Sequence, residues 1–272
     1  MKLSMASAAY GVVRWLPSYT IEETVNRVAD IGYDGIEIAA AGMGWPRYLN
    51  KEKRRKLIEL LKSRSLEVSA ICVFPGGHLG LNPASPLEVE RKEAIRYLKE
   101  SIELAADLGA EVALWVAGYQ VFGTPYDEAW RRSRDTLLAC VKDAEERDVI
   151  IAVEPTPVDS NIVNSADDAL KMMREADSKN VKVMFDTFHV LTKTADQATP
   201  IDYVKKMKQH LVHMHISDVN RQPPGTQTDF KPLINALKKI GYDRYLSAEI
   251  WTGPSPDNVA FQAFQYLKPL VK

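Results

Sequence analysis

Residues 149–154 read VIIAVE, residues 181–186 read VKVMFD, residues 211–216 read LVHMHI and residues 245–250 read YLSAEI. Each is a short, largely apolar stretch, and few such stretches in this chain alternate strictly with polar residues. Strands that are buried on both faces have this composition, which is typical of a parallel sheet. Eight such runs are expected to be strands: 3–9, 35–40, 68–74, 112–117, 149–153, 181–185, 211–216 and 245–250.

Longer stretches with a helical pattern separate these runs. Their apolar residues recur at i, i+3, i+4 and i+7, the spacing of one buried helix face. Thr20 is suited to cap the first helix and Gly32 to end it, and Ser165 precedes an Asp-rich first turn. Eight helices are predicted: 21–31, 51–63, 87–108, 126–147, 166–176, 201–209, 230–240 and 256–267.

Eight strands in strict alternation with eight helices predict a single (β/α)8 TIM barrel over residues 1–272. The length supports this, because one such barrel takes about 250 residues. Residues 31–38, IGYDGIEI, are echoed by residues 240–244, IGYDR, as a repeated unit would require. An open doubly wound sheet is the competing architecture, and the lack of a Gly-x-Gly-x-x-Gly sequence weakens its nucleotide-binding version.

Composition narrows the function classes. The chain has 35 Lys and Arg against 36 Asp and Glu, a formal net charge of −1, so no global attraction to nucleic acid or anionic membranes is expected. No apolar run approaches the roughly 20 residues that span a bilayer. Residues 1–13 contain the first predicted strand and are not expected to be a signal peptide, and the two cysteines, Cys72 and Cys140, do not form a disulfide framework. We therefore expect a cytoplasmic protein with reduced thiols.

Four consecutive predicted strands, the fifth to the eighth, end with an ionisable side chain. These are Glu154, Asp186, His215 and Glu249. Barrel enzymes place their reactive groups at the carboxyl ends of the strands, and burying three carboxylates there without a cation is costly. The set therefore predicts a divalent metal site, and its oxygen-rich ligands suit Mn²⁺, with Mg²⁺ and Co²⁺ as alternatives. A single strand glutamate such as Glu37 is expected to form only an ion pair within the barrel.

Several strings around these residues carry a family resemblance. They are EP at 154–155, FDTFH at 185–189, HISDVNR at 215–221, AEIW at 248–251 and GYDGIEI at 32–38. Together they resemble the sugar isomerase/epimerase family with a xylose-isomerase-like barrel, in particular the ketose 3-epimerases that act on tagatose and allulose. The resemblance extends over the whole chain and is densest in its second half.

This resemblance implies roles for individual residues. Glu154, Asp186, His215 and Glu249 would bind the metal, and the two glutamates would also act as the catalytic acid and base. His189 and Arg221 would hold oxygens of a sugar substrate, although a histidine packed under the rim and a solvated surface arginine are the ordinary alternatives. Apolar walls of the sugar pocket would come from Trp15, Trp115 and Trp251. Members of the family are usually homodimers or homotetramers.

One loop departs from the ketose 3-epimerase pattern. Those enzymes carry a second glutamate after the ligand on the fifth strand, whereas this chain reads EPTPVDSNIV at residues 154–163. The loop resembles the fructoselysine epimerase branch, with Asp159 one position before the expected glutamate and suited to the same substrate contact. The identity of the sugar therefore stays open.

The chemistry that such a site supports follows from its charges. A C–H beside a carbonyl becomes acidic enough when a cation stabilises the resulting cis-enediolate, and Glu154 and Glu249 can take and return the proton. Return to the opposite face gives an epimerase, and return to the neighbouring carbon gives an aldose–ketose isomerase. Loss of a β-hydroxyl from the same intermediate would give a lyase, such as an inosose dehydratase or an enzyme that eliminates from a 3-keto sugar.

Two further functions fit the sequence less well. An abasic-site endonuclease of the same barrel type needs three metals and many histidine ligands, whereas this chain has five histidines. A non-catalytic sugar sensor would not need all four proposed ligands.

Other polar residues near the strand ends have simpler expected roles. His213 shares a strand face with His215 and is expected to pack in the interior or support that ligand. Asp218 would cap the following turn or orient a ligand imidazole, with the cap slightly favoured. His78, in the sequence Pro75-Gly-Gly-His, is expected to face solvent more often than the site.

Overall fold

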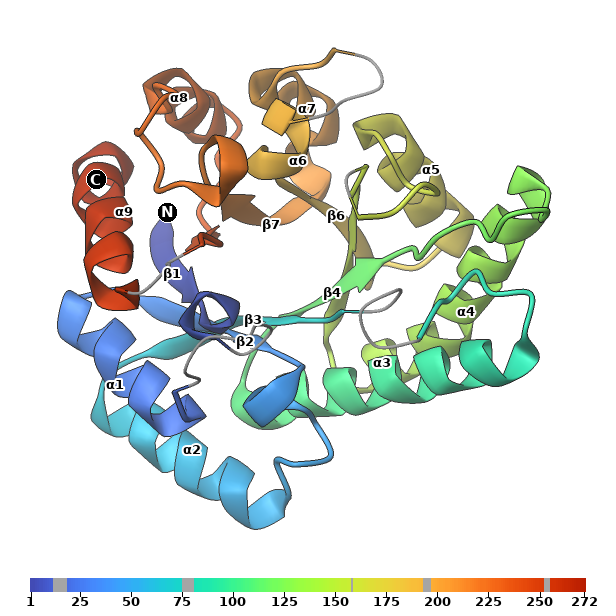
Figure 1. The fold of residues 1–272 in the computed structure, drawn as a ribbon, viewed down its shortest axis with the longest axis horizontal. Helices are drawn as coiled ribbons and strands as arrows, with labels where there is room; N and C mark the ends of the chain where they lie inside the picture. Colours follow the sequence, from blue (N-terminus) through green and yellow to red (C-terminus); the bar gives the residue numbers. More distant parts are fainter. Residues whose placement is uncertain (12–18, 75–80, 158, 193–196, 252–254) are drawn as a thin grey trace.

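Eight parallel strands close into a barrel in their order along the chain (Figure 1). The computed structural model describes residues 1–11, 19–74, 81–157, 159–192, 197–251 and 255–272. The ring closes where β1 pairs with β8, Leu3 lying opposite Leu246. The strands are β1 Lys2–Ala6, β2 Gly35–Ala39, β3 Glu67–Cys72, β4 Val112–Val116, β5 Ile150–Glu154, β6 Val181–Asp186, β7 Leu211–Ile216 and β8 Tyr245–Ala248. The predicted TIM barrel is confirmed, whereas a single domain over the whole chain stays a prediction.

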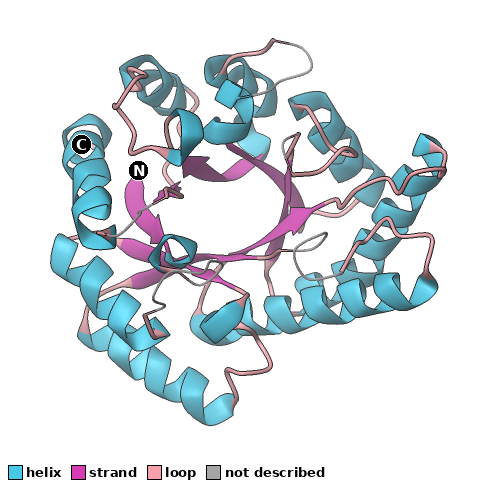
Figure 2. Cartoon of the chain, viewed as in Figure 1, coloured by secondary structure: helices cyan, strands magenta, loops and turns pink. Residues whose placement is uncertain are grey.

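Helices surround the barrel on its outside (Figure 2). Eight of them match the predicted ones: α1 Ile21–Ile31, α2 Lys51–Ser63, α3 Glu88–Leu108, α4 Tyr126–Glu146, α5 Ala166–Ala176, α7 Pro200–Met207, α8 Lys231–Lys239 and α9 Pro256–Val271. The expected caps are present: Thr20 forms a capping box with Glu23, Ser165 accepts from the Asp168 N–H, and Gly32 ends α1 with a φ of 103°. None of the helices that the structure describes is long and apolar enough to cross a membrane.

The sequence did not predict α6, which spans Thr187–Thr192. It begins directly after β6, where Asp186 Oδ1 accepts a hydrogen bond of 2.8 Å from the Phe188 N–H. A carboxylate at this position satisfies a free N–H and suits the helix dipole. Six residues are too few to show a helical period, so the sequence predicted the strand and its polar end but not the helix that follows.

Apolar side chains on the two faces of the sheet form two separate clusters. The larger contains strand residues such as Trp115 and Val153 together with helix residues such as Leu98 and Leu137. The smaller contains only strand residues: Ala70, Cys72, Val112, Leu114, Ala152, Met184 and Val212. The two clusters alternate along β4 and β5, as side chains on opposite faces must. The smaller cluster therefore fills the barrel, and the larger one joins the sheet to its helices.

Candidate active site

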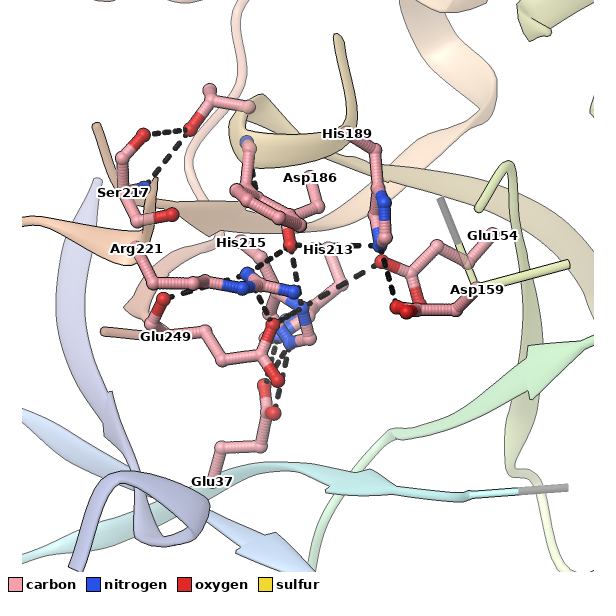
Figure 3. A network of polar contacts seen from close by, with 12 residues as sticks. Glu37, Glu154, Asp159, Asp186, His189, His213, His215, Ser217, Arg221 and Glu249 are labelled. Atoms are coloured by element: carbon pink, nitrogen blue, oxygen red, sulfur yellow. Dashed lines mark hydrogen bonds and ion pairs between the residues drawn. The ribbon is translucent and has the colours of Figure 1, made fainter. Parts of the chain in front are cut away.

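The four predicted ligands meet at the carboxyl-terminal rim of the barrel, within the polar network that Figure 3 shows. Glu154 and Asp186 are the last residues of β5 and β6, His215 is the penultimate residue of β7, and Glu249 directly follows β8. His215 Nδ1 lies 3.0 Å from Glu249 Oε2, 3.7 Å from Glu154 Oε1 and 3.9 Å from Asp186 Oδ2. Three side chains are buried, and that of Glu249 is 16% exposed. The structure thus brings the proposed ligand set together from four neighbouring strands.

The donor set fits a divalent cation. His215 Nδ1 is buried and three carboxylates surround it, with Glu249 Oε2 nearest at 3.0 Å. Asp186, His215 and Glu249 offer ligand atoms that all lie within 4.8 Å of one another, and so do Glu154, Asp186 and His189. Carboxylate oxygens with one imidazole nitrogen are ligands that Mn²⁺, Mg²⁺ and Co²⁺ accept. A ring nitrogen aimed at three carboxylates is what a shared metal site requires.

Arg221 supplies positive charge to the same cluster. Its Nη1 contacts Asp186 Oδ2 and lies 2.6 Å from Glu249 Oε2, and its guanidinium carbon lies 4.2 Å from the centroid of the Phe188 ring. Burial alone would lower the pKa of Arg221, but Asp186, Glu249 and Glu154 outweigh burial and raise it. The side chain is buried, so the alternative of a solvated surface arginine is wrong.

The two glutamates experience opposite electrostatic effects. Burial raises the pKa of Glu154 well above its usual value, and the negative charges of Asp186 and Glu249 add to this effect. Burial also acts on Glu249, but Arg221 and His215 outweigh it and hold the pKa of Glu249 well below the usual range. Environments that separate two carboxyl pKa values are typical of acid/base pairs. A bound cation would favour the ionised form of both groups.

His189 and Asp159 lie beside the carboxylates. His189 Nε2 is 3.6 Å from Asp159 Oδ2 and 4.0 Å from Asp186 Oδ2, and burial lowers the His189 pKa. The His189 side chain is 3% exposed, whereas that of Asp159 is 47% exposed. His189 Nδ1 has no hydrogen-bond partner in the described part of the chain. These two residues therefore offer polar atoms next to the proposed ligands.

The three tryptophans that the resemblance assigned to the sugar pocket have different positions. Trp115 is fully buried in the cluster that contains helix residues, and it pairs with Val153 rather than with Glu154. Its side chain therefore points toward the helices, and its assignment to the pocket wall was wrong. Trp251 is 53% exposed, and its backbone N–H donates to the Arg221 carbonyl over 2.8 Å. Trp15, like His78, lies outside the described residues.

The role expected of Glu37, an ion pair within the barrel, is only part of what the structure shows. Its carboxylate lies inside the barrel, where Oε2 is 2.6 Å from His213 Nε2 and Oε1 is 2.8 Å from His215 Nε2. Burial alone would raise the Glu37 pKa, but His215 and His213 outweigh it and lower the pKa to about 2. The expected ion pair is present, but one partner is a proposed metal ligand. The interior position of His213 is confirmed. A charged residue within the fully buried run of β2 was the available signal.

Asp218 is a structural cap, as the favoured alternative predicted. Its Oδ1 accepts a hydrogen bond of 2.8 Å from the Val219 N–H, and its Oδ2 accepts bonds of 2.7 and 2.8 Å from the N–H groups of Gln227 and Thr228. Asp218 therefore joins the start of the loop that carries Arg221 to the later residues Gln227 and Thr228 of the same loop.

Comparisons with known proteins agree with this fold. The family model described as xylose isomerase-like TIM barrel matches residues 25–270. The D-psicose 3-epimerase of Enterocloster bolteae is 26% identical over 246 residues, which cover 86% of this chain and 77% of that protein. The fructoselysine 3-epimerase of Shigella flexneri is 26% identical over 243 residues, 85% of this chain and 86% of that protein. A crystal structure of D-psicose 3-epimerase with D-tagatose from Clostridium cellulolyticum H10 superimposes with a TM-score of 0.83 at 21% identity and covers all of both chains.

Proposed function

Since the chain belongs to the xylose isomerase-like TIM-barrel family, we propose that it is a divalent-metal-dependent ketose 3-epimerase. One observation carries the proposal. Three carboxylates and one imidazole converge at the rim of β5 to β8, and an oxygen of each carboxylate lies within 3.9 Å of His215 Nδ1. Relatives that match most of this chain are named as epimerases of ketoses and of fructoselysine, which supports the same reaction class.

The acid and base would be Glu154 and Glu249. β6 and β7 separate their strands in the barrel order, so the two carboxylates can flank a ketose from opposite sides. One glutamate removes the proton from the carbon beside the carbonyl, and the other returns a proton to the opposite face, which inverts that carbon. A divalent cation held by the four ligands supplies electrostatic stabilisation for the negative charge that develops on the sugar oxygens.

Neighbouring residues would orient the sugar. The planar guanidinium of Arg221 and the imidazole of His189 can donate hydrogen bonds to adjacent sugar oxygens. Asp159 Oδ2 lies 3.6 Å from His189 Nε2, and its carboxylate can accept from a sugar hydroxyl. We also propose Trp251 and Trp15 as apolar walls, the first supported by its exposed position beside Arg221.

We propose Mn²⁺ as the working ion, a cytoplasmic location, and neither nucleic acid nor membrane as a partner. The free cysteines Cys72 and Cys140 support a reducing compartment, and the net charge of −1 provides no global attraction to polyanions. We also propose a homodimer or homotetramer.

A screen in D₂O tests the function. Ketohexoses, ketopentoses and inososes are incubated with the protein and Mn²⁺, Mg²⁺ or Co²⁺, and the products are analysed by NMR. We expect inversion at C3 of a ketose, with deuterium incorporated at that carbon and no loss of water. Formation of a dehydrated product would instead establish the lyase alternative. No conversion of any sugar with any of the three metals would contradict the proposal.

Variants connect this reaction to the site. E154Q and E249Q should each lose at least about 100-fold in kcat, because a positioned acid or base contributes on this scale. E146Q is the matched control, since Glu146 is an exposed residue at the end of α4 whose carboxylate lies 3.6 Å from Lys142 Nζ. Full activity in E154Q or E249Q would exclude that glutamate from catalysis.

A further inference from the structure

A buried polar cluster lies inside the barrel beneath the proposed metal ligands. It consists of Glu37 on β2 and of His213 and His215 on β7, and all three side chains are almost fully buried. Figure 3 shows the Glu37 side chain directed toward the two imidazoles. Nothing in the acid/base chemistry proposed above uses Glu37.

The two ring nitrogens of His215 have separate partners. Nε2 lies 2.8 Å from Glu37 Oε1 and 3.0 Å from Glu37 Oε2, whereas Nδ1 faces Glu249, Glu154 and Asp186. An ionised carboxylate can only accept hydrogen bonds, so Nε2 must donate to Glu37. A neutral imidazole that carries its proton on Nε2 has its lone pair on Nδ1, the atom directed at the rim.

We propose that Glu37 is a positioning residue for the metal site: it fixes the tautomer and ring orientation of His215 so that Nδ1 binds the cation. The inference rests on the metal site in the proposed function and adds a residue that acts through a ligand. Carboxylates that accept from the second nitrogen of a ligand histidine orient the ring and raise its basicity, and their loss typically weakens metal binding by about 10- to 100-fold.

His213 holds Glu37 in turn. Its Nε2 lies 2.6 Å from Glu37 Oε2, and its ring packs edge-on against that of His215 with centroids 5.6 Å apart. The carboxylate thus receives a donor from each imidazole, which restricts its rotation. Ligand atoms of Glu37, His213 and His215 also lie within 4.8 Å of one another, a spacing that could hold an ion of its own. Hydrogen bonds already join these atoms, which favours a positioning role over a second metal site.

Mn²⁺ binding to E37Q tests the proposal without any need for catalysis. The amide keeps the shape of the glutamate but replaces one acceptor oxygen with an NH₂ donor, so it cannot accept from both imidazoles. Metal-free protein is titrated with Mn²⁺, and free Mn²⁺ is measured by electron paramagnetic resonance. We expect E37Q to bind about 10- to 100-fold more weakly than the wild type. E37D keeps a shorter carboxylate and should recover part of the loss.

Ser4→Ala is the matched control. Ser4 is also a fully buried polar residue in the barrel wall, but its hydroxyl bonds Ser69 over 2.6 Å instead of the histidines. S4A should keep its Mn²⁺ affinity within about twofold. Absorption by bound Co²⁺ gives a second measurement that reports ligand geometry directly. Its visible bands should change in E37Q and stay unchanged in S4A.

Three other outcomes would contradict the positioning role of Glu37. Wild-type affinity in a folded E37Q, or equal losses in E37Q and S4A, overturns the positioning role while leaving the proposed function intact. Two Mn²⁺ ions per wild-type chain, with one lost in E37Q, overturns it in favour of a second metal site. A wild-type protein that binds no Mn²⁺, Mg²⁺ or Co²⁺ overturns the rim site and the proposed function together.

Discussion

The role of Trp115 depends on which face of its strand it occupies. It lies near the carboxyl end of β4, where the family resemblance assigned a wall of the sugar pocket, yet its side chain packs among the helices. Val116, the next residue along, pairs with Glu154, so Val116 and not Trp115 lies on the interior face. Strand register relative to the barrel interior is a tertiary property, and the largely apolar run of β4 contains no polar alternation to reveal it.

Replacement of Trp115 should therefore affect stability and leave substrate binding unchanged. We expect W115A to lower the free energy of unfolding by about 3–5 kcal/mol, the usual cost of truncating a buried tryptophan, as measured by urea denaturation. W115F, which is more certain to fold, should lose less stability and keep the wild-type KM. W251A is the contrasting variant, with little loss of stability and a raised KM. A raised KM in W115F at unchanged stability would return Trp115 to the pocket.

Arg221 offers a second test at the scale of one residue. Its guanidinium lies between Asp186 and Glu249, so replacement by Met leaves two buried carboxylates without their cation. Removal of one partner from a buried ion pair typically costs about 3–5 kcal/mol, and we expect this loss in metal-free R221M. Mn²⁺ should restore much of the stability, because a divalent cation compensates the same charges. Urea unfolding with and without Mn²⁺ measures both effects, and equal stability of metal-free R221M and wild type would contradict them.

At the scale of elements, the long helices were predictable and the short ones were not. Helix α1 combines an apolar face with a capping box at Thr20 and a glycine stop at Gly32, and all three signals are local in sequence. Helix α6 has only six residues. Strand β1 ends at Ala6, and a 3-10 helix over Ser7–Tyr10 replaces the last part of the predicted strand. Those residues are small or aromatic and carry no turn signal, so the apolar run continued past the true strand end.

The loop between β7 and α8 should depend on the charge of Asp218. Burial alone would raise the Asp218 pKa, but hydrogen bonds from Gln227, Thr228 and Val219 outweigh it and lower the pKa. A lowered folded-state pKa means that the stabilisation is complete above the unfolded value of about 3.9 and is lost as pH falls through the folded value. We expect D218N to be about 2 kcal/mol less stable than the wild type at pH 7.

The same gap should shrink as the pH falls below about 4, because the wild-type carboxyl then becomes neutral as well. Urea denaturation of both proteins between pH 7 and pH 3 measures the difference. A gap that stays constant over this range would show that the loop depends on the shape of Asp218 and not on its charge.

At the scale of the whole molecule, barrel closure creates contacts that no local pattern contains. Glu37 and His215 are 178 positions apart, and their strands β2 and β7 are not neighbours in the sheet. The four rim ligands were predictable because parallel strands deliver their ends to one rim whatever the register. The Glu37 contact required knowledge of which residues point inward across the closed barrel, and the sequence offered only a charged residue within an apolar run.

Closure also links the metal site to global stability, because the four ligands come from strands β5, β6, β7 and the end of β8. An ion that binds only the folded protein stabilises it by about 2.7 kcal/mol at a concentration of 100 times its Kd. A chain of this size gains roughly 2–4 °C in Tm per kcal/mol, so saturating Mn²⁺ should raise the Tm of EDTA-treated protein by about 5–10 °C. Differential scanning calorimetry measures this shift. E249Q should lose most of it, because one ligand is gone, whereas E146Q should keep it in full. A wild-type Tm that is identical in EDTA and in Mn²⁺ would contradict the ligand assignment at its root, since binding that is selective for the folded state must appear as stability.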